Sequence, residues 1–302
     1  MQISFFKCLF VIIVIVLLMN SRQHFTTFTQ SFITEKNQKC GMRDHVFHTY
    51  QKCLEEMLPN KDLWKHITPV MEMKCGMKLL SRLLNVKFLR NKDEVKKFIY
   101  PVSMDEKIVS ISLGIGNDNQ VEKQLKEIFK NIELFGADPF EATAESFFWI
   151  GIANDGKING TVLVDGSYKT QTIPSITFGN YLKKINRKFI DFLLIDIEGP
   201  EYFSLPQIFE SEMRNEYTVC QINVELHGPL KNYGVDDKYF DKIMLASLSS
   251  SFLPLDIEMP YIHHQVFYLN WRNRDCVQKS IISLMGELGP PLDHYHWNSS
   301  LF

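Results

Sequence analysis

Residues 189–201 read Phe189-Ile190-Asp191-Phe192-Leu193-Leu194-Ile195-Asp196-Ile197-Glu198-Gly199-Pro200-Glu201, an apolar run that ends in acidic residues. A nearly continuous apolar run of this kind is typical of a strand buried on both faces of a parallel sheet. The carboxylates of Asp196, Glu198 and Glu201 follow it directly. Burial of such charges is costly unless they are paired, hydrated or bound to a ligand. Because ligands of open α/β sheets bind at the carboxyl ends of the strands, this segment predicts both a fold and the position of a site.

Strand-like and helix-like segments alternate on both sides of this run. Further strands are expected at residues 107–113, 132–137, 147–153, 218–226 and 265–271. Helices are expected at residues 120–131, 205–212 and 239–249, and residues 173–186 should contain a turn and a short helix. This alternation predicts the α/β class, with a doubly wound, mostly parallel sheet that carries helices on both faces.

A glycine-rich turn, Gly114-Ile115-Gly116-Asn117-Asp118, ends the first of these strands. Glycine has no Cβ and tolerates positive φ, so such a turn lets a ligand approach the backbone closely. Asp138 lies 22 residues after Gly116, at the end of the next strand. At that place a carboxylate can accept hydrogen bonds from both hydroxyls of a ribose. The alternative for Asp138 is a capping role before Pro139.

A second polar group, Glu225 and His227, follows the strand expected at residues 218–226. Side chains two residues apart on an extended chain face the same way, so both should reach the region of Asp196 and Glu198. A histidine beside carboxylates can serve as a general base. Two structural alternatives stay open. In one, His227 is a hydrogen-bonded structural residue; in the other, Glu201 caps the next helix and Glu198 meets a neighbouring backbone amide.

Charge and composition limit the classes of partner. The chain has 302 residues, a net charge of -2 and a pI near 6.5, so it has no overall positive field that would attract nucleic acid. The lysine-rich stretch Lys87–Lys97 is interpreted as the solvated face of a helix.

The N-terminal region is divided by composition. Residues 1–20 contain the apolar run Cys8–Met19 and are predicted to be a signal anchor or a cleaved signal peptide. Residues 21–38 are polar and resemble a stem, residues 39–100 are predicted to be a helical N-terminal region, and residues 101–302 form the main domain. Either reading of the apolar run predicts the secretory pathway, as a single-pass type II protein of the ER or Golgi or as a secreted one. Sequons at Asn159 and Asn298 agree with glycosylation there.

The cysteines suggest an oxidising compartment. Cys220 lies in an apolar strand pattern and is predicted to be a buried free thiol, whereas Cys40, Cys53, Cys75 and Cys276 could form two disulfides in any of three pairings. No Cys or His spacing typical of structural zinc is present, and no metal site is predicted. An ion bridged by Asp196, Glu198 and Glu225 is the alternative.

Taken together, four motifs resemble the FkbM-type methyltransferases, and most of all the nematode members that carry a short N-terminal apolar segment. The resemblance covers about residues 75–280, and it rests on Gly114-Ile115-Gly116-Asn117-Asp118, Phe135-Gly136-Ala137-Asp138-Pro139, Ile195-Asp196-Ile197-Glu198-Gly199-Pro200-Glu201-Tyr202 and Gln221-Ile222-Asn223-Val224-Glu225-Leu226-His227. It implies a Rossmann-like class I methyltransferase fold with a seven-stranded sheet over residues 101–302, and S-adenosylmethionine as cofactor. It also implies O-methylation of a small-molecule or glycan acceptor.

The resemblance assigns roles to particular residues. Gly114 and Gly116 would lie against the methionine portion of the cofactor, within the loop that continues through Asn117 and Asp118. Asp138 would hold the ribose. The residues that would approach the adenine are Ile152, Ala153 and Asn154. Asp196 would sit by the sulfonium or the acceptor. The strand pattern, rather than the resemblance, adds Glu198, Glu225 and His227 to the candidate catalytic residues.

One departure from the family pattern leaves two functions open. Ser112 stands where an acidic residue usually begins the glycine loop. That carboxylate often steadies the methionine end of the cofactor, so its loss bears on cofactor affinity. The first hypothesis is an active methyltransferase in which His227, Asp196 or Glu198 removes the acceptor's proton. The second is a catalytically inactive binding module, secreted or tethered to the membrane, that kept the fold.

Overall fold

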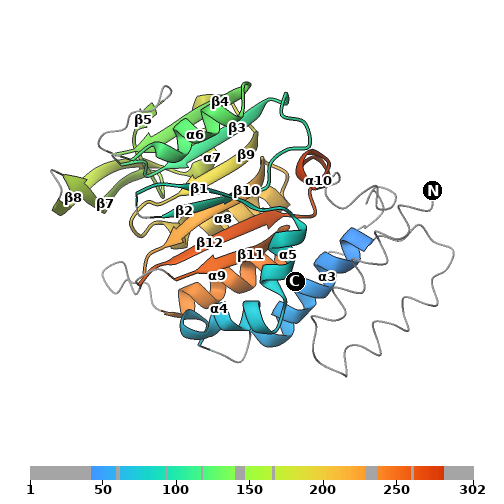
Figure 1. Cartoon of the computed structure of the whole chain (residues 1–302). Coiled ribbons are helices and arrows are strands. Elements are labelled where there is room, and N and C mark those ends of the chain that lie inside the picture. Colours follow the sequence, from blue (N-terminus) through green and yellow to red (C-terminus); the bar gives the residue numbers. More distant parts are fainter. Residues whose placement is uncertain are drawn as a thin grey trace, which may run out of the picture.

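The computed structural model describes residues 42–58, 62–92, 94–116, 118–139, 147–164, 167–228, 237–259 and 262–281. Its centre is a seven-stranded sheet with the order β11-β12-β10-β9-β3-β4-β5 (Figure 1). The strands are β3 (Ile108–Leu113), β4 (Ile132–Asp138), β5 (Phe147–Trp149), β9 (Phe189–Ile195), β10 (Thr218–Leu226), β11 (Phe252–Glu258) and β12 (His264–Asn270). The predicted α/β class and the Rossmann-like, mostly parallel seven-stranded sheet are confirmed.

The strand order changes direction between β3 and β9. From β3 the chain moves outward to β4 and β5, and it then returns to place β9 on the other side of β3. All neighbouring strands from β5 to β10 are parallel, whereas β12 is antiparallel to both β10 and β11. The carboxyl ends of β3 and β9 therefore border the crevice in which open α/β sheets bind ligands.

The two faces of the sheet are covered differently. On one face, side chains such as Ile111, Leu193 and Val224 join a large core with α7 (Phe178–Ile185), α8 (Glu201–Met213) and α9 (Asp237–Ser249). On the other face, Ile108, Phe192 and Leu194 pack with α6 (Gln120–Ile128) and with a β-hairpin. Helices α3 (Met42–Met57), α4 (Leu63–Met73) and α5 (Met77–Leu83) complete the core at the β11 end of the sheet.

The hairpin corrects one prediction. Residues 87–97 do not form a solvated helix face: β1 (Lys87–Arg90) and β2 (Val95–Phe98) pair as antiparallel strands, and Lys96 and Lys97 are only 5% and 2% exposed. The ammonium of Lys97 lies 3.1 Å from a carboxylate oxygen of Asp256 on β11. Local sequence could not reveal this partner, because it lies far away along the chain. Helices α3–α5 lie within residues 39–100, which were predicted to be helical, and the hairpin lies after them in the same region.

Two other segments differ in detail from the expected elements. The strand expected at residues 147–153 is divided between β5 and β6 (Gly151–Ile152), which belongs to a separate three-stranded sheet with β7 (Gly156–Val164) and β8 (Ser167–Ile176). This small sheet projects from one side of the body (Figure 1). Strand β11 was not expected, and it contains Pro254 near a register shift, as an edge strand tolerates.

Within the described part of the chain, the cysteines form two disulfides, Cys53–Cys75 and Cys220–Cys276. The prediction of a free Cys220 is therefore wrong. Its burial was expected correctly, but α10 (Arg274–Ser280) brings Cys276 against the strand that carries Cys220. These bonds are compatible with a secretory or extracellular location. Among the described residues, none of the helices has the length and hydropathy needed to cross a membrane. The predicted anchor (1–20) and stem (21–38) lie outside the described residues.

Candidate functional site

The polar residues gather at the edge formed by the carboxyl ends of β3, β4, β9 and β10. Gly114 follows β3, Asp138 ends β4, Asp196 follows β9, and His227 follows β10. Four segments that are far apart in the sequence therefore meet beside the reversal of strand order. This is the edge that the sequence predicted.

The glycine loop is built on close backbone contact. Gly114 has φ +76°, and a Cβ at that position would lie 1.6 Å from the carbonyl oxygen of Asp196. Gly116 has φ +54°, and its missing Cβ would meet nothing within 4 Å. The amide of Gly116 donates a hydrogen bond to Asp138 Oδ2 at 3.0 Å. The loop thus packs at Gly114 against the residue that follows β9, and it is open at Gly116. Its hydrogen bond joins it to Asp138, the carboxylate predicted to hold a ribose.

A carboxylate stands beside Ser112 after all. The Ser112 hydroxyl donates to Glu122 Oε1 at 2.5 Å, and Glu122 is a buried residue of α6. Burial raises the pKa of Glu122, an effect that the hydrogen bond from Ser112 opposes. A buried carboxylate of the helix after the glycine loop therefore lies beside the position at which β3 lacks an acidic residue. The only sequence signal for it was an acidic residue near the inward side of an amphipathic helix.

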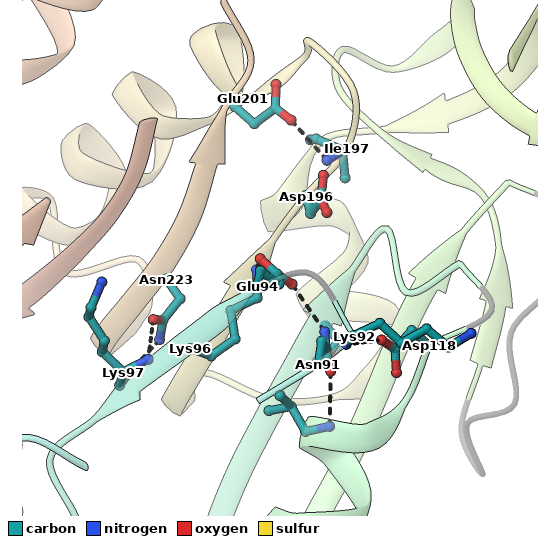
Figure 2. A network of polar contacts seen from close by, with 12 residues as sticks. Asn91, Lys92, Glu94, Lys96, Lys97, Asp118, Asp196, Ile197, Glu201 and Asn223 are labelled. Atoms are coloured by element: carbon teal, nitrogen blue, oxygen red, sulfur yellow. Dashed lines mark hydrogen bonds and ion pairs between the residues drawn. The ribbon is translucent and has the colours of Figure 1, made fainter. Parts of the chain in front are cut away.

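The remaining residues predicted to bind the cofactor are placed unequally. Asp118 accepts hydrogen bonds from the amides of Lys92 and Gln120, so its carboxylate joins the loop to the hairpin (Figure 2). Asn117 lies outside the described residues. Ala153 is buried after β6, and exposed Asn154 accepts a hydrogen bond from Gln207 Nε2 on α8.

His227 is the centre of an acidic cluster. Its side chain is 7% exposed, and its Nδ1 lies 3.0 Å from Glu201 Oε1. Its Nε2 faces the other way, 3.5 Å from Asp196 Oδ1 and 3.3 Å from Glu198 Oε2. The side chains of Asp196 and Glu198 are about one-third exposed. The structure therefore brings together three of the four predicted catalytic residues.

Glu201 holds this cluster in place. It is fully buried, and it accepts hydrogen bonds from the amides of Ile197 at 2.9 Å and Gly199 at 2.7 Å. Glu198 and Gly199 both have positive φ, 57° and 121°, so the chain turns back tightly before α8 begins. Glu201 thus binds backbone amides of the loop before its helix, whereas the structural alternative was that it caps that helix. The same carboxylate orients the ring of His227.

The hairpin contributes two residues that sequence reasoning missed. Glu94 and Lys96 form an ion pair, and carboxylate oxygens of Glu94, Asp196 and Glu225 lie within 4.8 Å of one another. In Figure 2, Glu94 and Lys96 lie on the hairpin below Asp196, and Glu201 lies on its other side. Hairpin and sheet are held together by the side chain of Asn223, which bonds both the amide and the carbonyl of Lys97. Glu225, the fourth predicted catalytic residue, thus belongs to this second group.

The sequence model of the methyltransferase FkbM domain matches residues 31–252. The chain belongs to this family. The match includes both the glycine loop and the acidic cluster, and it establishes a methyltransferase in general terms. No curated protein matches the chain.

The electrostatics of this FkbM methyltransferase are dominated by negative charge at the acidic cluster. Burial raises the pKa of Asp196 well above its usual range, although Lys96 and His227 oppose the shift, and burial likewise raises the pKa of Glu225. Burial lowers the pKa of His227, but Glu201, Asp196 and Glu198 outweigh it and raise that pKa to about 10. Carboxylates outnumber cationic side chains here, so the cluster favours the binding of protons or other cations.

Proposed function

We propose that this protein transfers a methyl group from S-adenosylmethionine to a hydroxyl oxygen of a small molecule or glycan in the secretory pathway. The observation that carries the proposal is the bond from the Gly116 amide to Asp138, at the edge where strand order reverses. An acidic residue at the end of the second strand, beside a glycine turn at the end of the first, is the arrangement that binds the ribose of a nucleoside in doubly wound folds. The family match supports the same reading.

The residues present fit this cofactor. The space in front of Gly116 is open, since a Cβ there would meet nothing within 4 Å. Asp138 would hold the ribose, and the backbone from Gly114 to Gly116 would lie against the methionine portion. Glu122 stands beside Ser112 and could take the part of the carboxylate that β3 lacks. This carboxylate supports an active cofactor site in spite of the departure at Ser112.

The acidic cluster suits the acceptor side of the reaction. When bound, S-adenosylmethionine supplies a methyl group on a positively charged sulfur and is left as a neutral thioether. The acceptor's hydroxyl oxygen gains the methyl group and loses its proton, which a carboxylate of the cluster accepts. Asp196 adjoins the glycine loop, because its carbonyl packs against Gly114. Its neighbour Glu225 lies at the end of the adjacent strand β10.

The charge of the cluster narrows the class of acceptor. Glu94, Glu198 and Glu201 add further carboxylates around Asp196 and Glu225. Such a site repels phosphate and carboxylate groups, and it admits neutral hydroxyl compounds such as glycans. This argument also disfavours nucleic acid as acceptor. The two disulfides support a reaction in an oxidising compartment.

Calorimetric titration of the full-length protein with S-adenosylmethionine tests the proposal. We expect binding in the micromolar range, and we expect Asp138→Ala to lose it because the ribose hydroxyls lose their acceptor. Circular dichroism of the variant must match that of the wild type. If the folded wild-type protein does not bind the cofactor, the proposal fails, and the non-catalytic binding module becomes the better explanation of the fold.

A further inference from the structure

The ring of His227 points a nitrogen at two carboxylates that it does not approach closely. Its Nε2 lies 3.5 Å from Asp196 Oδ1 and 3.3 Å from Glu198 Oε2. A charge-assisted hydrogen bond is shorter, at about 2.7–2.9 Å. Ligands of a tetrahedral ion with bonds of about 2.0–2.1 Å lie roughly 3.3–3.4 Å from one another. The separation from Glu198 equals such a ligand–ligand distance, and the separation from Asp196 is slightly longer.

A second observation, independent of these distances, concerns the other ring nitrogen. A histidine that binds a metal through one ring nitrogen almost always donates a hydrogen bond from the other to a carboxylate or carbonyl. This bond fixes the tautomer and the orientation of the ring. Here Nδ1 is held at 3.0 Å by Glu201, a carboxylate with no exposed surface. Glu201 also binds the amides of Ile197 and Gly199, which flank Glu198. One buried residue thus sets the positions of both His227 and the loop that carries Glu198.

We propose that Asp196, Glu198 and His227 bind a divalent metal ion. A nitrogen and two carboxylate oxygens are a ligand set that suits Zn²⁺, and three protein ligands leave one position open. The ligand atoms of these residues lie within 4.8 Å of one another, and two of the three side chains are partly exposed. The neighbouring group of Glu94, Asp196 and Glu225 already holds a cation, the ammonium of Lys96.

The role of the ion rests on the methyl transfer proposed above, whereas its binding does not. An ion at this place would orient an acceptor hydroxyl toward the glycine loop and make its proton easier to remove. Glu225 lies outside the ligand set and remains to receive that proton. This set differs from the alternative drawn from the sequence, because His227 replaces Glu225.

The test is calorimetric titration of the full-length, chelator-treated protein with Zn²⁺. We expect one ion per chain at the site, and a loss of affinity of at least tenfold in Glu198→Gln and in His227→Gln. The matched control is Glu210→Gln, which makes the same change at an exposed position of α8. This variant should bind Zn²⁺ like the wild type. If Glu198→Gln also binds like the wild type, the proposal is overturned. Glu198→Gln decides alone if circular dichroism shows that His227→Gln does not fold.

The two proposals fail in different ways. Asp138→Ala should lose S-adenosylmethionine and keep Zn²⁺, whereas Glu198→Gln should do the reverse. Zinc binding that depends on Glu198, in a protein that does not bind the cofactor, would keep the metal site and remove the methyl transfer. If the protein binds the cofactor but Glu198→Gln leaves its zinc affinity unchanged, the metal site is removed and the methyl transfer is kept.

Discussion

The two halves of the site edge are built by different means. The glycine half uses backbone: Gly114 packs on the carbonyl of Asp196, and the amide of Gly116 bonds to Asp138. The acidic half uses side chains from several segments, and its charges are balanced only in part by Lys96 and His227. The first half depends on the shape of one turn. The second depends on the balance of charge among residues that folding brings together.

The largest expected effect comes where the halves touch. Gly114→Ala would strain a backbone with φ +76° and drive a Cβ into the Asp196 carbonyl. We expect it to lower the free energy of unfolding by at least about 3 kcal/mol. Gly116→Ala, at φ +54° but in open space, should cost only about 1 kcal/mol. Urea denaturation measures both, and equal costs for the two variants would show that the halves are not in contact at Gly114.

A smaller effect tests the charge balance of the acidic half. Lys96→Met removes a buried ammonium and leaves Glu94, Asp196 and Glu225 without it. Removal of one partner from a buried ion pair lowers the free energy of unfolding by about 3 kcal/mol. Because Asp196 is partly exposed, we expect a decrease of roughly 2 kcal/mol here. Exposed Lys92 on the same hairpin is the control, and Lys92→Met should change stability by less than about 0.5 kcal/mol. Similar values for the two variants would contradict the charge balance described here.

The smallest effect concerns the packing behind the acidic half. His264 is buried between Trp64 and Phe240, and its Nε2 bonds to the Trp64 carbonyl. Burial lowers the pKa of His264 to about 4, although the bond to Trp64 opposes this. Between this pKa and the unfolded value of about 6.5, only the unfolded chain takes up the proton. The contribution of neutral His264 to stability is therefore fully present above about pH 6.5, and it is lost as the pH falls from there toward about 4.

We expect the free energy of unfolding to drop by about 1–2 kcal/mol more between pH 7 and pH 5 in the wild type than in His264→Phe. Chemical denaturation of both proteins at both pH values gives the drop in each. Comparison of the two drops removes any pH-independent cost of losing the bond to Trp64. Parallel pH profiles of the two proteins would exclude His264 as the source.

The same contrast explains what the sequence could predict. The sheet, the glycine turn and the place of Asp138 depend on local patterns, and the structure has all three where the sequence put them. The roles of Lys96 and Glu122 depend on partners in other elements, and neither was predicted. A lysine-rich stretch is interpreted as solvent-exposed unless its acidic partners, here Glu94 and Asp256, are known. Cys220 shows the same limit, because its burial could be read from its strand but its partner Cys276 could not.

The two disulfides have a consequence for biosynthesis. Cys53 and Cys75 are 22 residues apart, whereas Cys220 precedes Cys276 by 56 residues. A chain made from its N-terminus exposes Cys53 and Cys75 to oxidation long before Cys220 is synthesised. Of the four cysteines that lie in the described ranges, only Cys220 and Cys276 then remain when α10 emerges. The order of translation thus favours the native pairing, and strand β10 is linked covalently only when α10 is in place.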